Sequence, residues 1–166
     1  MTSFTIVDAN DNPIGAKQRL DKQYDDIYRV SALWLTDSVS GDILLAQRKY
    51  TKNNDPGKWA AAVAGTVEPD ETYESNITKE IEEEIGLLNI SLSDGPKEFI
   101  DDGDNKFFCQ WFVGSVDRSK VLIKIQEEEV ESVKWVSVQW LLQDVKLNSQ
   151  DYVPSMSNNL QVLCQA

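Results

Sequence analysis

The chain has 166 residues, 41% of them hydrophobic, and carries a formal net charge of −12. This length suits one domain with a full core, whereas the negative charge argues against a nucleic-acid polymer or an anionic membrane as a partner, since both would repel it. The chain contains no histidine, which excludes His-based triads, His general bases and His-ligated zinc.

The sequence predicts many strands, with two or three helices between and after them. Strands are predicted over residues 3–8, 28–36 and 43–49, as two strands within 98–116, and over 130–137. A turn is predicted at 9–15, a hairpin connection at 37–42 and a loop at 50–59. Residues 60–68 are expected to lead into the first helix. Further helices are predicted over 138–145, with Ser137 as N-cap, and within 155–165. This order favours one α/β or α+β layered domain over residues 1–166.

The N-terminus and the cysteines bear on the cellular compartment. The first ten residues lack a basic segment followed by a long apolar one, and no stretch approaches the roughly 18 apolar residues of a membrane span. We therefore expect a soluble, cytoplasmic protein. Free thiols are favoured over a disulfide for Cys109 and Cys164.

Four glutamates crowd one turn of the first helix, in the segment KEIEEEIG at residues 79–86. At about 100° per residue, Glu80, Glu83 and Glu84 share one face, and Glu82 points nearly opposite. Like charges one turn apart repel by roughly 0.2–0.5 kcal/mol per pair. A Mg²⁺ ion would turn this repulsion into attraction, because it takes oxygen ligands and shares them with substrate phosphates. A solvated acidic helix face is the alternative interpretation.

An apolar stripe beside the glutamates predicts how this helix is held. The stripe consists of Tyr73, Ile77, Ile81 and Ile85. The helix can therefore bury one edge and keep its carboxylates at the border of the core. Asp70 or Thr72 is expected to cap its start, and Gly86 suits a left-handed C-cap.

The spacing from Gly65 onward forms a longer motif. GTVEPDETYESNITKEIEEEIGL reads Gly, five residues, Glu71, seven residues, then Lys-Glu-apolar-x-Glu-Glu-x-Gly-apolar. This pattern resembles the Nudix box, in which an Arg stands in place of Lys79. The resemblance implies a Nudix-type α/β/α sandwich with a mixed β-sheet, and hydrolysis of a diphosphate with Mg²⁺ or Mn²⁺.

By position, the resemblance also implies roles for individual side chains. It makes Glu80, Glu83 and Glu84 the metal ligands. It gives Glu71 a part in supporting the loop or the residue at the Arg position. A lysine there offers a point charge where an arginine offers a planar fork, so we expect looser positioning of the neighbouring carboxylates.

The segments around the box are similar to the subgroup related to isopentenyl-diphosphate isomerase. These segments are IVDANDNPIG, YRVSALWL and PGKWAAAVAGTVE. That similarity implies phosphate-facing cations at Arg48 and Lys52, for which a solvated strand end and loop are the alternative. The isomerase's catalytic Cys and metal-binding His residues are missing, with WAAAVAG before the box and Tyr28 where a His is expected. Hydrolysis is therefore favoured over isomerisation.

A general base must come from a residue other than histidine. The segment QEEEVES offers Glu127, Glu128 and Glu129 before the last strand, and we favour Glu128, with a solvated acidic loop as the alternative. The expected chemistry is attack of a metal-bound water on one phosphorus of a diphosphate.

Two functions follow from these observations. The leading one is a Mg²⁺-dependent Nudix hydrolase that cleaves a small nucleoside-diphosphate-type or other organic diphosphate. The alternative, based on Lys79 and the absent histidines, is a non-catalytic Nudix domain that binds a phosphorylated ligand as a sensor. A homodimer is compatible with the sequence, although no segment argues for one.

Overall fold

The structure is a computed structural model that describes residues 2–164 as nine strands and three α-helices. The strands are β1 (Ser3–Val7), β2 (Pro13–Gln18), β3 (Ile27–Asp37), β4 (Ile43–Arg48), β5 (Trp59–Ala61), β6 (Val63–Thr66), β7 (Leu92–Asp101), β8 (Lys106–Val116) and β9 (Val130–Val136). The α-helices are α1 (Tyr73–Ile85), α2 (Val138–Leu147) and α3 (Met156–Leu163), and the short 3₁₀ helices are η1 (Arg19–Asp21) and η2 (Ser149–Asp151). Over the described range, every helix is too short or too polar to cross a membrane.

Strand β3 is the centre of a mixed sheet. It pairs antiparallel with β1, β4 and β6, and parallel with β8 along its whole length, from Ile27 opposite Lys106 to Asp37 opposite Val116. Strand β4 continues the sheet through β5 and β9, while β7 forms an antiparallel hairpin with β8. A central strand that is buried on both faces needs a continuous apolar run, which SALWL supplies in β3.

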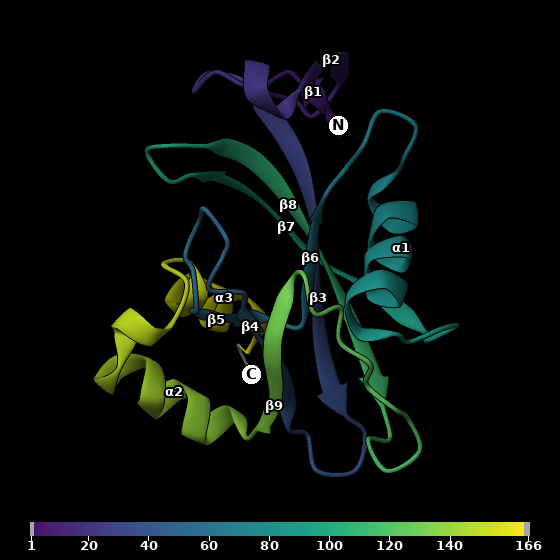
Figure 1. Cartoon of the computed structure of the whole chain (residues 1–166), viewed down its shortest axis with the longest axis vertical. Helices are drawn as coiled ribbons and strands as arrows, with labels where there is room; N and C mark the ends of the chain where they lie inside the picture. The colour runs from purple at the N-terminus through teal and green to yellow at the C-terminus, as the bar shows by residue number, and fades with distance from the viewer. Residues whose placement is uncertain (1, 165–166) are drawn as a thin grey trace.

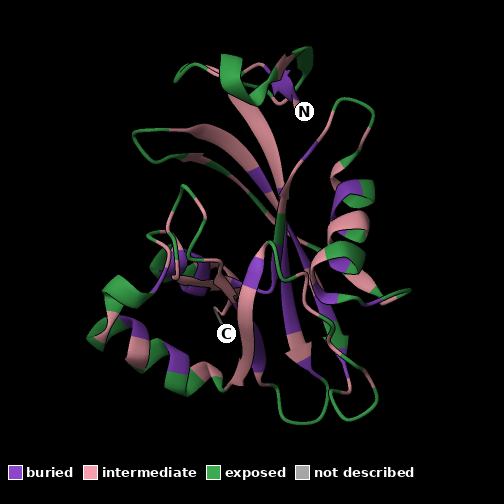
Figure 2. Cartoon of the chain, in the orientation of Figure 1, coloured by how far each residue is buried: buried purple, intermediate pink, exposed green. Residues whose placement is uncertain are grey.

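Helices cover both faces of this sheet, so the predicted α/β/α sandwich is confirmed (Figure 1). Side chains alternate along β3: Ala32 and Trp34 pack toward α2 and α3, whereas Leu33 and Leu35 pack toward α1. Figure 2 shows the buried residues along β3 and on the inner side of α1. One apolar core therefore holds α1 against the sheet, and a second core on the other face holds α2 and α3.

The predicted strands over 3–8, 28–36, 43–49 and 130–137 are confirmed, as are the hairpin within 98–116 and the three helices. Residues 60–68 lead into the first helix as expected, but they do so through strands β5 and β6, which the sequence reasoning did not predict. Alanine and glycine have low strand propensity, and here pairing with β4 and β3 outweighs it. The turn predicted at 9–15 ends earlier than expected, since Pro13 begins the edge strand β2, where a proline is tolerated.

Candidate active site

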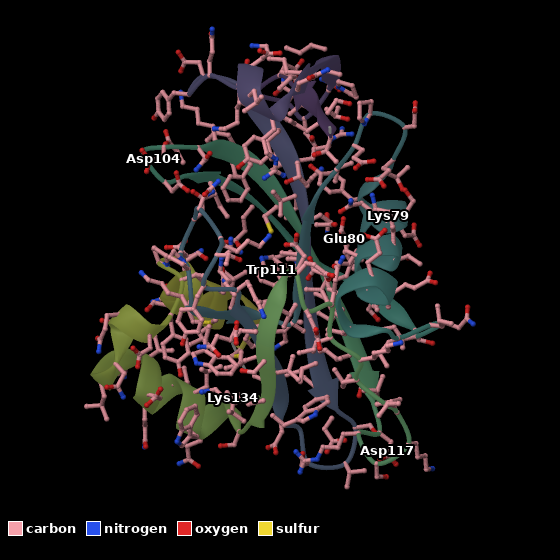
Figure 3. The ribbon with its side chains drawn as sticks, in the orientation of Figure 1. Lys79, Glu80, Asp104, Trp111, Asp117 and Lys134 are labelled. Atoms are coloured by element: carbon pink, nitrogen blue, oxygen red, sulfur yellow. The ribbon has the colours of Figure 1, made fainter. Side chains whose placement is uncertain are left out.

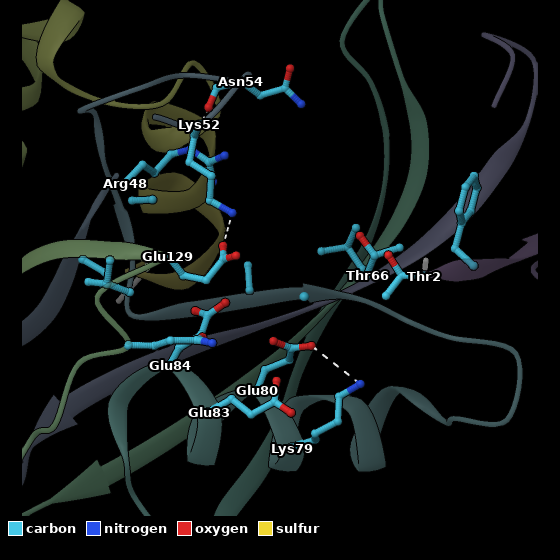
Figure 4. A pocket seen from close by; sticks show the side chains of 18 of the residues that line it. Thr2, Arg48, Lys52, Asn54, Thr66, Lys79, Glu80, Glu83, Glu84 and Glu129 are labelled. Carbon is cyan, nitrogen blue, oxygen red and sulfur yellow. Dashed lines mark hydrogen bonds and ion pairs between the residues drawn. The ribbon is translucent and has the colours of Figure 1, made fainter. Parts of the chain in front are cut away.

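A cavity of about 690 Å³ opens beside α1, within the size range of small-molecule sites. Glu80, Glu83 and Glu84 line it from the α1 side. Arg48 and Lys52 line it from the end of β4 and the loop that follows, as Figure 4 shows. The cavity thus brings together the predicted metal ligands and the predicted phosphate-binding cations.

The two ends of α1 fix the direction of its carboxylates. Thr72 is the N-cap: its hydroxyl accepts a hydrogen bond from the Ser75 N–H at 3.0 Å, while the Ser75 hydroxyl accepts one from the Thr72 N–H at 2.9 Å. Gly86 ends the helix in the left-handed region with φ 71°. Between them Ile77, Ile81 and Ile85 are buried, so the predicted apolar stripe holds the helix against the sheet.

Gly65 explains how Glu80 comes close to the sheet. A Cβ at position 65 would collide with the Glu80 side chain. Gly65 therefore lets that side chain pass directly against strand β6, beside which Figure 3 shows Lys79 and Glu80. Both glycines of the motif act through the backbone, as the sequence predicted.

Burial sets the electrostatics of the α1 carboxylates. It raises the pKa of Glu84 to about 8, with the charge of Glu80 adding to the effect and Lys52 opposing it. Burial likewise raises the pKa of Glu80. Glu83 is exposed. Because Glu80 and Glu84 are half-buried, ionisation of either carboxylate costs free energy, and a nearby cation would offset that cost.

Lys79 stands at the Arg position of the motif and bridges several carboxylates. Its ammonium pairs with Glu71 and lies 3.6 Å from a Glu68 oxygen and 3.9 Å from a Glu80 oxygen. Glu71 also accepts hydrogen bonds from the Asn76 side chain at 2.8 Å and from the Glu68 N–H at 3.0 Å. The oxygens of Glu71 are occupied by these donors, in accord with a supporting role.

The glutamate that the sequence favoured as general base, Glu128, differs from the one that the structure places at the cavity. Glu128 is exposed and lies outside the lining, whereas Glu129 lines the cavity and pairs with Lys52. The reason is register: Arg48 stands opposite Val130, and the Lys49 N–H donates to the Glu129 carbonyl at 3.2 Å. The β4–β9 ladder therefore carries Glu129, and not its neighbour, to the cavity.

Arg19 is a cavity residue that the sequence reasoning missed. It stands in η1, directly after the edge strand β2, and lines the cavity together with Ser3 and Phe4 of the N-terminal hairpin. The hairpin thus adds a third cation to Arg48 and Lys52. Nothing in the local pattern around Arg19 marks it, because its proximity to the cavity depends on long-range strand pairing.

The donor chemistry of the α1 carboxylates fits a hard divalent cation. Glu80, Glu83 and Glu84 offer only oxygens, which Mg²⁺ and Mn²⁺ prefer. Within residues 2–164, no three carboxylates lie close enough together to form a ready-made metal site. The residues fit the ion chemically, and metal binding would have to draw them together.

Comparison with protein families supplies the deciding observation: the model of the NUDIX domain matches residues 27–156. The chain belongs to the Nudix family. The prediction made from the box is thereby confirmed, and the family segment contains every predicted site residue. The hairpin that carries Arg19 precedes this segment.

Three similar proteins indicate the subgroup and the fold of this Nudix chain. It is 30% identical to a prenyl-diphosphate phosphatase of Methanosarcina mazei, over 93% of this chain and 90% of that one. It is 28% identical to an isopentenyl-diphosphate Delta-isomerase of Corynebacterium diphtheriae, over 73% and 70%. The crystal structure of DR0079 from Deinococcus radiodurans has the same fold, with a TM-score of 0.83 at 17% identity, covering 96% of this chain and 97% of that one. The predicted subgroup is therefore confirmed.

Within the described residues, the cavity lining contains no cysteine or histidine of the kind that the isomerase uses for catalysis and metal binding. Ala64 occupies the cavity lining within the WAAAVAG segment. Cys109 is buried in β8, where burial raises the pKa of its thiol to about 12, and it does not line the cavity in the described part of the chain. Hydrolysis over isomerisation stays a prediction from the sequence.

Proposed function

We propose that this protein is a Mg²⁺-dependent hydrolase of a small organic diphosphate. The observation that carries the proposal is the arrangement in one cavity: the carboxylates of α1 line one side beside Lys79, and three further cations line it from other elements, together with Glu68 and Glu129. The cations are Arg19, Arg48 and Lys52. Such an arrangement matches a diphosphate with a divalent ion, because the cations neutralise phosphate oxygens that the carboxylates alone would repel.

Glu80, Glu83 and Glu84 are the residues that would hold Mg²⁺, with Mn²⁺ as a substitute. The bound ion would supply charge neutralisation and a water of lowered pKa. Arg48 is oriented for the phosphate by its own hydrogen bond, since its Nε donates to the Asn54 carbonyl at 2.9 Å and leaves its other N–H groups for a ligand.

Glu129 replaces Glu128 as our proposed general base. In the free protein it pairs with Lys52 across the cavity. A phosphate that binds Lys52 would compete for the same ammonium and release the Glu129 carboxylate. That carboxylate could then accept a proton from the attacking water.

The substrate stays open between two chemical classes. A relative named as a prenyl-diphosphate phosphatase supports an organic diphosphate with an apolar group, and Phe4, Val30 and Ala46 give part of the cavity an apolar lining. The three cations suit a nucleoside diphosphate linkage equally well. A hydrolysis screen should therefore include prenyl diphosphates, nucleotide sugars, dinucleotides and nucleoside triphosphates, each with and without Mg²⁺.

We expect release of phosphate or of a monophosphate from at least one class, and only when Mg²⁺ or Mn²⁺ is present. The second candidate function is a ligand-binding sensor, which Lys79 at the Arg position favours. Thermal stabilisation by a diphosphate compound without turnover would support the sensor and contradict the hydrolase.

We also propose that residues 1–166 act as one Nudix domain, to which the N-terminal hairpin contributes part of the site. A cytoplasmic location and a homodimer stay predictions from the sequence.

A further inference from the structure

Asp11 lies in the turn between β1 and β2, ahead of the segment that the NUDIX model matches. Its side chain is 10% exposed. The carboxylate accepts hydrogen bonds from Arg29 Nε at 2.7 Å and from the Tyr73 hydroxyl at 3.0 Å, and it pairs with the Lys97 ammonium. Arg29 Nη2 also donates to the Asp11 carbonyl at 2.6 Å. A turn residue is thus almost completely enclosed by donors.

These donors come from three separate elements. Arg29 belongs to β3, Tyr73 is the first residue of α1, and Lys97 belongs to β7. Both cations also lie over the Tyr73 ring, with Arg29 Cζ 5.1 Å and Lys97 Nζ 4.7 Å from its centroid. We call these four residues the Asp11 cluster. The cluster joins the N-terminal hairpin to the sheet and to the start of the helix that carries the carboxylates.

Other contacts also hold the hairpin: the Phe4 ring packs edge-to-face against Tyr28 of β3 at 5.4 Å between centroids, and Lys17 pairs with Asp26 at 2.7 Å. Strand β1 pairs with β3 at only two positions, Ile6 with Tyr28 and Val7 with Ile27. The Thr5 N–H adds one hydrogen bond, to the Val67 carbonyl at 3.2 Å. The hairpin and η1 supply Ser3, Phe4 and Arg19 to the cavity lining. These other contacts join the hairpin to β3 and the segment before it, whereas the Asp11 cluster ties its turn to α1 and β7.

We propose that Asp11 is a positioning residue that holds the N-terminal wall of the cavity against α1 and thereby sets the affinity for a diphosphate group. This proposal rests on the proposed function, because it takes the cavity as the diphosphate site. The pKa of Asp11 supports the geometry: burial raises it, but the hydrogen bonds from Lys97 and Arg29 outweigh burial and hold the pKa below its usual range.

The backbone of Asp11 permits a discriminating variant. Asp11 has φ 63°, in the left-handed region that glycine adopts without strain. Asp11→Gly should therefore keep the turn while deleting the carboxylate. Asp11→Asn keeps the size of the side chain and deletes only its charge. A purely local role in the turn would be preserved or improved in the glycine variant, whereas a role in the cluster is lost in both.

Asp37 offers a matched control, because its side chain is 2% exposed and pairs with Arg118 at the opposite end of β3. At roughly 3.3 Å per residue it lies on the order of 25 Å along the strand from Arg29. Asp37→Asn should reduce thermal stability without changing the cavity, so it separates a general loss of stability from a loss of positioning.

The test measures binding of inorganic pyrophosphate by calorimetry in the presence of Mg²⁺, and hydrogen exchange of the β1 and β2 amides. For Asp11→Gly and Asp11→Asn we expect a dissociation constant raised by about tenfold and faster exchange in both strands. For Asp37→Asn we expect the wild-type affinity. For a substrate found in the screen, KM should rise in the Asp11 variants while kcat is retained, since binding and not the chemical step is affected.

The outcomes separate this proposal from the proposed function. Wild-type affinity and wild-type exchange in Asp11→Gly would overturn the role of Asp11, whatever the enzyme hydrolyses. If the wild type binds pyrophosphate but turns over no member of the panel, the hydrolase proposal fails and the Asp11 variants still decide the positioning role. A wild type that binds no pyrophosphate would overturn both.

Discussion

Lys79 on α1 pairs with Glu71 in the loop before that helix, so an ion pair joins the loop part of the motif to its helix. Glu71 is 15% exposed and Lys79 is 33% exposed. The pair therefore lies at the boundary between the core and solvent. The Lys79 ammonium supplies a positive charge beside the Glu71 carboxylate, so the ion pair forms with a lysine at the Arg position.

Removal of the Lys79 charge should destabilise the fold. Lys79→Met leaves a largely buried carboxylate without its cation, and we expect a loss of about 1–2 kcal/mol in the free energy of unfolding, a value that allows for partial screening by solvent. Denaturant unfolding measures it. Lys79→Arg serves as the control and should stay within about 0.5 kcal/mol of the wild type. Equal stability of Lys79→Met and wild type would show that Glu71 does not need this partner.

The pair formed by Lys52 and Glu129 leads to a kinetic prediction. Glu129→Gln should lower kcat by about 10²-fold or more, the usual contribution of a general base. KM should not increase, because the lysine is freed for the phosphate. Steady-state kinetics on the substrate identified in the screen measures both.

Glu128→Gln is the matched control for that experiment. Glu128 is exposed and lies outside the cavity lining, so this variant should have wild-type kcat and KM. The reverse result, with Glu128→Gln impaired and Glu129→Gln active, would restore the glutamate that the sequence favoured.

Asp37 gives a pH dependence of stability whose sign follows from its hydrogen bonds. The Ser40 hydroxyl and the Arg118 backbone N–H lower the pKa of Asp37 from 3.8 to about 2 in the folded protein. A depressed pKa means that the folded state favours the ionised form. The stabilisation is therefore complete above the ordinary value of 3.8 and is lost as the pH falls toward 2.

The difference in melting temperature between wild type and Asp37→Asn isolates this effect. The variant should melt at a lower temperature at neutral pH, and the difference should shrink as the pH is lowered from about 4 to about 2. A difference that stays constant over this range would contradict the role of the ionised carboxylate.

The parts of the site that the sequence predicted are those encoded locally. Glu80, Glu83 and Glu84 share a helix whose period, caps and apolar stripe all agree, so their common face follows from spacing alone. The prediction that Arg48 faces a phosphate came from the similarity to the isopentenyl-diphosphate isomerase subgroup, and composition alone would not have supplied it. The structure brings these residues into one cavity.

The parts that the sequence reasoning missed depend on contacts between distant segments. Strands β5 and β6 are rich in alanine, and only their neighbours β4 and β3 make them strands. Glu129 reaches the cavity because Val130 stands opposite Arg48, and Arg19 reaches it because β1 of the N-terminal hairpin pairs with the start of β3. A strand register of this kind cannot be derived from one sequence, since each local pattern allows several pairings.

The rate of diphosphate hydrolysis during a Mg²⁺ titration, compared between wild type and Glu84→Gln, tests the central claim most directly. The account predicts a rate that rises to saturation with Mg²⁺ in the wild type, vanishes when the ion is chelated, and is lost in a folded Glu84→Gln variant. Hydrolysis that continues without a divalent ion, or that survives intact in Glu84→Gln, would contradict the assignment of the α1 carboxylates as the metal site.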